Sequence, residues 1–443
     1  MIAREYRTWM EDFGCLFALF CILTFAANWV WFTGDKEIAK FVPEYPTLPI
    51  RFSHTRPDHL SAEVFNVAKA IYDGRGFSDP FGDETGPTGW TPPVLSSLMA
   101  AMLWLSGGSK DGVAIMFMVL QNIILALIGT VCIEIGRRQQ AVGPMIMAIA
   151  LVVLTNFMWI FQLTDDCIFL MFWVAITLVG LCRWPSPPSN KLHLVCWGFF
   201  GGVAALSGPV AGFCWAASTS VCWGWRNWKE VVLVGAVSIV IVAPWVGYQS
   251  FRLGEFVPIK SNASFELYQS QSVLPNGLYT QHSCRLHPYY SSSVEGARYR
   301  EVGERAYLVE KKNDAWSSIR KDPKSFLGKI AKRLLAATIW LHSDRSSFVE
   351  HPQFFWCRMM AVVPFIGLLG VCLFGVSKTD TWIKPAICCY VFYLLPYVLV
   401  SYYERYGVPA TLPKILFVFW FFRSIRDQIR IRFGSGVAKI DRS

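Results

Sequence analysis

Long apolar runs, separated by short polar stretches, make up most of the chain. They lie at residues 13–32, 113–135, 142–161, 167–182, 193–206, 210–223, 231–245, 355–376, 382–400 and 408–422. About 20 apolar residues in a helix cross the hydrocarbon core of a bilayer, which is roughly 30 Å thick. The pattern therefore predicts an all-α polytopic membrane protein with roughly ten transmembrane helices. The length of the first run and the acidic Glu11 and Asp12 beside it favour a membrane helix over the alternative, a signal peptide.

Two apolar stretches differ from simple membrane-spanning helices. Pro92 and Pro93 open a helix that reaches about Leu105, which is too short to cross a bilayer, so we expect it to lie along the external interface. Ser207-Gly208-Pro209 interrupts a longer apolar tract. We interpret this break as a sharp turn between two helices, with a kink inside one helix as the alternative.

Basic residues orient the predicted helices. With the N-terminus in the cytoplasm, every inner loop and the tail after residue 422 carry Lys or Arg. The chain then divides into a transmembrane module at 1–247 with an external loop at 34–112, an external segment at 248–354, and C-terminal membrane helices with a basic cytoplasmic tail at 355–443. Both termini are expected in the cytoplasm.

The external parts have their own local patterns. Residues 58–73 have helical spacing of apolar side chains, and Gly74 and Gly76 follow as a stop signal. The stretch 256–262 resembles a strand, and helical patterns follow at 293–320 and from Pro323 onward. We therefore expect a smaller external α/β segment beside the membrane helices.

Composition supports this class and excludes several functions. Hydrophobic residues make up 53% of the chain and charged residues only 16%, whereas soluble domains are about 25% charged. The net charge of +10 fits cytoplasmic Lys and Arg better than nucleic-acid binding, because no basic stripe with interleaved aromatics occurs. Most of the 13 Cys lie in apolar runs and no CxxC occurs. Motifs for nucleotide binding, serine hydrolysis or zinc proteolysis are missing.

The predicted topology brings ionisable residues to one face of the membrane. They are Asp58, Glu63, Asp165, Asp166, Lys260, His287, Glu295, Glu404 and Arg405. Ionisable groups at the membrane are costly and often functional. A carboxylate with cations facing one space suits transfer onto a hydroxyl, because the carboxylate takes the proton and the cations hold a phosphate leaving group.

Four stretches resemble a known family. The first external loop has an acidic residue, an amphipathic helix, GRGFSDPF at 74–81, GPTGW at 86–90 and a Pro pair. Pro244-Trp245 is followed by GEFVPIKSN at 254–262, then by His287-Pro288, Glu295 and GERAY at 303–307, and the last loop reads ERYGVP at 404–409. Together these are similar to bacterial GT-C glycosyltransferases related to the dolichyl-phosphate-mannose protein mannosyltransferases.

The resemblance implies a function and roles for residues. The protein would move one sugar, with inversion, from a polyprenyl-phosphate carrier to an acceptor hydroxyl on the external face of the bacterial inner membrane. Glu63 would be the general base, since Asp58 lies too early in the loop. Arg405 and Lys260 would bind the lipid phosphate, and His287 and Glu295 would belong to the substrate site. Either Asp165 or Asp166 could fill the acidic position of the second external turn.

Other parts of the family pattern are changed. Arg405 is the only basic residue left in the last loop, and Tyr248-Gln249 stands where an Arg-Asn pair is expected. The visible residues require no cofactor, although the pair Asp165-Asp166 leaves a divalent metal open.

Each of these residues also has a structural interpretation. Glu63 could lie on a solvated helix face, Asp165 or Asp166 could cap the next helix, and Arg405 could anchor the chain at the interface. Two alternative functions follow: a lipid or sugar transporter or flippase, which would favour charges in mid-membrane, and a non-catalytic membrane scaffold.

Overall fold

The structure, a computed structural model, describes residues 2–28, 62–82, 84–161, 166–278, 287–290, 293–339, 362–374 and 380–440. These residues are largely helical and contain no strand, only isolated bridges between Ser78 and Pro87 and between Leu278 and Tyr402. The all-α architecture that the sequence predicts is therefore confirmed for the described part of the chain.

Five helices within the described residues are long and apolar enough to cross a membrane. Three of them are α1 (Ile2–Ala27) from Arg7 onward, α6 (Lys110–Arg138) and α9 (Asp166–Arg183). The other two are Trp225–Leu253, which is a 3-10 turn followed by α12 (Trp228–Leu253), and Arg405–Ile429, which begins before α21 (Thr411–Ile440) and continues into it. Shorter apolar helices accompany them: α5 (Pro93–Leu105), α7 (Val142–Thr155), α10 (Lys191–Ser207), α19 (Val362–Phe374) and α20 (Ile383–Leu399). A total of roughly ten transmembrane helices stays a prediction.

The outer surface of the bundle is apolar. Ile239 and Val240 on α12 are 69% and 68% exposed, and Leu19, Ile22 and Phe25 on α1 are exposed as well. Such a surface would be unfavourable in water, whereas lipid chains cover it without loss. Length, composition and this outward apolar surface together describe an integral membrane protein.

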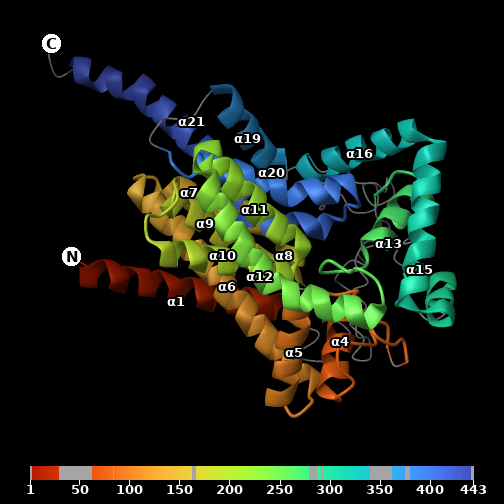
Figure 1. Ribbon diagram of the computed structural model, residues 1–443. Helices are drawn as coiled ribbons and strands as arrows, with labels where there is room; N and C mark the ends of the chain where they lie inside the picture. The colour runs from red at the N-terminus through yellow and green to blue at the C-terminus, as the bar shows by residue number, and fades with distance from the viewer. Residues whose placement is uncertain are drawn as a thin grey trace, which may run out of the picture.

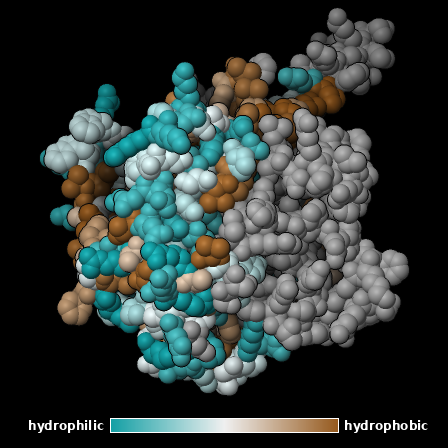
Figure 2. All heavy atoms as spheres, turned by 90° about the vertical axis from the view of Figure 1, so that its right-hand side faces the viewer, coloured by the Kyte–Doolittle hydropathy of each residue, from teal (hydrophilic) through white to brown (hydrophobic). Residues whose placement is uncertain are grey.

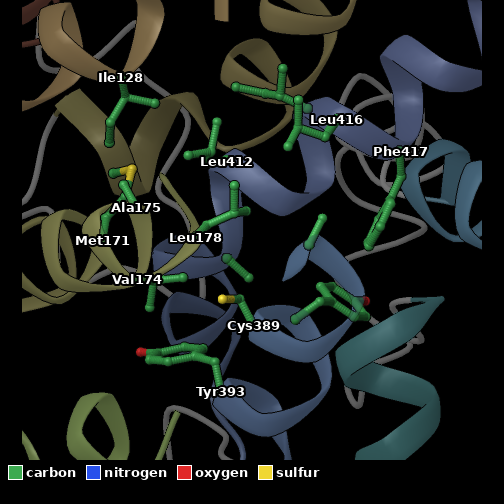
Figure 3. Close-up of a cluster of buried hydrophobic side chains, with 14 of the residues drawn as sticks. Ile128, Met171, Val174, Ala175, Leu178, Cys389, Tyr393, Leu412, Leu416 and Phe417 are labelled. Atoms are coloured by element: carbon green, nitrogen blue, oxygen red, sulfur yellow. The ribbon is translucent and has the colours of Figure 1, made fainter. Parts of the chain in front are cut away.

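The interior of the bundle is closely packed. Figure 3 shows part of one buried cluster, to which α9 contributes Val174 and Leu178, α20 contributes Cys389, and α21 contributes Leu416 and Phe417. Glycines allow bulky rings to approach elsewhere: a Cβ at Gly201 would lie 2.5 Å from Trp215. Small residues at helix contacts are typical of membrane bundles.

The predicted break at Gly208 is a turn between two helices. α10 ends at Ser207, and α11 (Pro209–Trp223) begins with proline in its first turn. A Cβ on Gly212 would lie 2.5 Å from that of Ala205, so the two helices fold back against each other. The structure therefore favours the turn over a kink in one helix.

Five of the remaining helices gather at one end of the bundle. They are α4 (Ala62–Tyr72), α13 (Ala263–Tyr268), a π-helix η3 (Gln269–Val273), α15 (Val294–Lys321) and α16 (Pro323–Thr338). We expect this end to lie outside the membrane and call it the extramembrane end. In Figure 1, α13, α15 and α16 lie on the side of the molecule away from the N- and C-terminal ends of the chain. Figure 2 looks onto that end, where the described side chains are mostly hydrophilic.

The structure confirms the two helices that the sequence predicts at 293–320 and from Pro323 onward, which are α15 and α16. The Ser293 side chain caps α15 by accepting a hydrogen bond from the Gly296 amide at 2.8 Å. Asp322 caps α16 in the same way through the Ser325 amide at 2.9 Å. Gly303 breaks α15 into two arms with a φ of 76°, a conformation that glycine adopts without strain.

The α/β character predicted for the external segment is wrong for its described residues. The stretch 256–262 forms no strand. Its backbone donors bond elsewhere: the Val257 amide to the Ser250 hydroxyl at 3.1 Å, and the Ser261 amide to the Gly89 carbonyl at 2.8 Å. Pro258 has no donor, so the stretch cannot sustain a ladder of hydrogen bonds.

Candidate functional site

A buried carboxylate joins separate segments at the extramembrane end. Glu304 of α15 is 4% exposed. Its oxygens accept four hydrogen bonds, from the Gly89 amide (2.8 Å) and the hydroxyls of Thr88 (2.5 Å), Ser261 (2.7 Å) and Tyr299 (2.8 Å). Burial raises the pKa of Glu304, while these donors act in the opposite direction. The turn before Trp90 and the segment that carries Lys260 are thereby fixed against α15.

The carboxylate of Glu63 and the imidazole of His287 form a pair. Glu63 lies in the first turn of α4, and its Oε1 is 3.2 Å from His287 Nε2. The Tyr289 amide donates to His287 Nδ1 at 3.2 Å, so that nitrogen carries no proton. The hydrogen of the neutral ring therefore sits on Nε2, from where it is donated to Glu63.

Aromatic side chains surround His287. Phe81, Trp90 and Phe265 each meet its ring edge to face, with centroids 5.7, 5.9 and 5.2 Å away. Burial among these rings lowers the pKa of His287, although the Glu63 carboxylate acts to raise it. The imidazole is therefore neutral at pH 7, and it orients the Glu63 carboxylate without neutralising its charge.

Charged residues from distant parts of the chain also affect the pKa of His287. Electrostatic effects of Glu266, Arg405 and Lys260 act on His287 together with that of Glu63. These residues come from α4, the 256–262 segment, α13 and the 3-10 helix η4 (Glu404–Ala410). The site therefore contains carboxylates and cations around one buried imidazole.

Tyrosine rings hold Arg405. Its guanidinium lies 5.6 Å from the ring centroid of Tyr403 and 5.5 Å from that of Tyr406. Such cation–π contacts restrict the side chain without consuming its charge. Tyr406 in turn stacks on Tyr397 of α20, with centroids 4.3 Å apart. The position of Arg405 is thereby linked to the apolar helix α20.

Asp166 borders this side of the site. It is the first residue of α9, and its charge and that of Arg405 both act on the Tyr397 hydroxyl. Asp165 and Asp58 lie outside the described residues, as does the side chain of Glu404. Of the predicted acidic pair, Asp166 is thus the member that can be placed.

Glu295 occupies a different environment. It is buried and forms an ion pair with Lys311 at 2.9 Å. The hydroxyls of Tyr268 and Tyr307 donate to it at 3.1 and 2.7 Å. These partners saturate the carboxylate and join the two arms of α15, which is a structural role. Its assignment to the substrate site stays a prediction without support from these contacts.

The described residues offer no complete metal site. No three His, Cys, Asp or Glu side chains come together in the part of the chain that the structure covers. Glu63 and His287 are an oxygen and a nitrogen donor beside each other, but divalent cations in proteins usually have more ligands than two.

Two acidic residues of this region had no assigned role in the sequence analysis. Glu304 belongs to the GERAY stretch, where its spacing from Tyr307 gave no hint of four distant donors. Glu266 follows the FVPIKSN stretch by four residues and shares α13 with Phe265, which contacts His287. A helix directly after that motif is the local signal that could have indicated Glu266.

Comparison with known proteins adds no relative. No family model matches the chain, and neither a curated protein nor a solved structure matches it.

Proposed function

We propose that this protein is a GT-C-type glycosyltransferase, which moves a single sugar from a polyprenyl-phosphate carrier to an acceptor hydroxyl. One observation carries the proposal: at the extramembrane end of an apolar bundle, Glu63 pairs with His287, and the charges of Lys260 and Arg405 act on the same imidazole. The four residues come from the four stretches that resemble this family. The acceptor is a lipid, a glycan or a protein.

The geometry suits a single displacement. Glu63 Oε1 accepts the His287 hydrogen, which leaves Oε2 to take the proton of the acceptor hydroxyl. The acceptor oxygen then bonds to the anomeric carbon as the bond from that carbon to the phosphate oxygen breaks. The electron pair leaves with the polyprenyl phosphate, whose added charge Arg405 and Lys260 stabilise. One displacement inverts the anomeric centre.

The arrangement also suits a lipid carrier. The outward apolar surface of helices such as α12 can face lipid chains, whereas α13, which carries Glu266, lies on the side of the molecule away from both chain ends. We place the protein in a bacterial inner membrane, with both termini cytoplasmic and the site external. A reporter fused after Ser443 should be cytoplasmic and one inserted near Asn276 external; both on the same side would overturn this orientation.

The proposal is tested with purified protein and a radiolabelled sugar on polyprenyl phosphate. Release of polyprenyl phosphate together with labelled acceptor supports it. Movement of the intact donor across a vesicle membrane without bond cleavage would indicate a flippase. Neither transfer nor movement, across a panel of donors and acceptors, would leave a scaffold and refute the proposal.

A further inference from the structure

Gln249 of α12 has a buried amide with no partner in the described structure. The residue is 1% exposed, and neither its Nε2 nor its Oε1 meets a hydrogen-bonding group. The buried amide of Asn28, by contrast, donates to the Phe161 carbonyl at 2.6 Å. An amide carries two N–H donors and an acceptor, and burying it without partners is destabilising. Such a group requires an explanation beyond packing.

The position of Gln249 relates it to the candidate site. Trp245 and Leu253, one helical turn before and after it, both contact the loop that leads to Trp90. Residues four apart lie on one helix face, so Gln249 faces that loop as well. The Trp245 indole donates at 3.1 Å to the carbonyl of Ile259, the residue before Lys260. Gln249 therefore shares its helix face with two residues that contact the segments leading to Trp90 and Lys260.

The chemistry of an amide selects the kind of ligand. A phosphate offers mainly acceptors and would leave Oε1 without a donor, and a prenyl chain offers neither. Adjacent hydroxyls of a sugar ring offer both, so that one accepts from Nε2 while the next donates to Oε1. The neighbouring Trp245 adds an aromatic ring, whose apolar face suits the C–H face of a sugar.

We infer that Gln249 binds two neighbouring hydroxyl groups of the donor sugar and helps to set which sugar is transferred. This inference rests on the proposed function, and it names a binding contact for the sugar that the resemblance leaves open.

The test compares donors that differ by one hydroxyl. Initial rates are measured for the wild type with its preferred polyprenyl-phosphate sugar and with each single-deoxy analogue. Gln249→Leu and the equally long Gln249→Met should lower kcat/KM for the full sugar about tenfold to a hundredfold. Both variants should lose the preference of the wild type for the full sugar at one or two ring positions. Gln121→Leu serves as control: this buried amide donates at 3.4 Å to the Ile160 carbonyl on another part of the bundle, and discrimination should be unchanged.

The outcomes separate this inference from the proposed function. Wild-type transfer with the same discrimination in both Gln249 variants would overturn the sugar contact and leave the transferase intact. Absence of transfer by the wild type with every donor would overturn both. If Gln249→Leu does not insert into membranes, Gln249→Met decides alone, because it keeps the length of the side chain.

Discussion

Replacement of Glu63 by Gln is the most direct test of the proposed mechanism. The variant keeps the size of the side chain and an oxygen that can still accept the hydrogen of His287, 3.2 Å away. It cannot take a proton from an acceptor hydroxyl. General-base catalysis contributes about 10²–10⁴-fold, so turnover should fall at least about a hundredfold. Exchange of one partly exposed hydrogen bond should cost the fold no more than about 1 kcal/mol.

The assay is the release of polyprenyl phosphate under saturating donor, with donor binding and thermal unfolding measured on the same preparation. Glu266→Gln is the matched control, because Glu266 is a second carboxylate whose charge acts on His287. Asp58→Asn should have a small effect. Normal turnover in Glu63→Gln would refute the base assignment, and a hundredfold loss confined to Glu266→Gln would transfer the role to that residue.

Three further changes have defined outcomes. Arg405→Ala should raise the apparent KM for the lipid donor about tenfold or more, because charge-assisted phosphate contacts contribute roughly 1.5–3 kcal/mol; an unchanged KM would make Arg405 an interfacial anchor. Glu304→Gln should lower the free energy of unfolding by about 2 kcal/mol or more, since four donors face its carboxylate, whereas the exposed Glu301→Gln should have little effect in the same thermal melts. The pKa of His287 is lowered in the folded protein. As the pH falls below about 6.5, His287 is therefore protonated in the unfolded chain before it is protonated in the folded protein, and the free energy of unfolding decreases. His287→Gln should flatten that dependence in melts between pH 7.5 and 5, and an equally steep curve would contradict it.

Much of the fold follows from signals that lie close together in the sequence. The Pro pair starts α5 and the apolar run ends at Leu105, so both bounds could be predicted. Gly208 with Pro209 separates α10 from α11, and Ser293 and Asp322 cap the helices that follow them. Each signal acts on backbone groups within one or two turns, which is why no distant contact was needed to interpret it.

The site depended on contacts between distant residues. FVPIKSN has strand-like residues, but the partners of its backbone come from Gly89 and Ser250, so it forms an irregular segment instead. Contacts between distant residues also decide the partners of the carboxylates. Glu63 pairs with His287, on which the charge of Glu266 also acts, whereas Glu295 forms an ion pair with Lys311. Sequence patterns show which residue types are present near the membrane surface. The packing of α4, α13 and α15 decides which carboxylate contacts a neutral imidazole and which contacts a lysine. Electrostatic and hydrogen-bond energies depend on distances between these helices, and a local sequence pattern does not contain those distances.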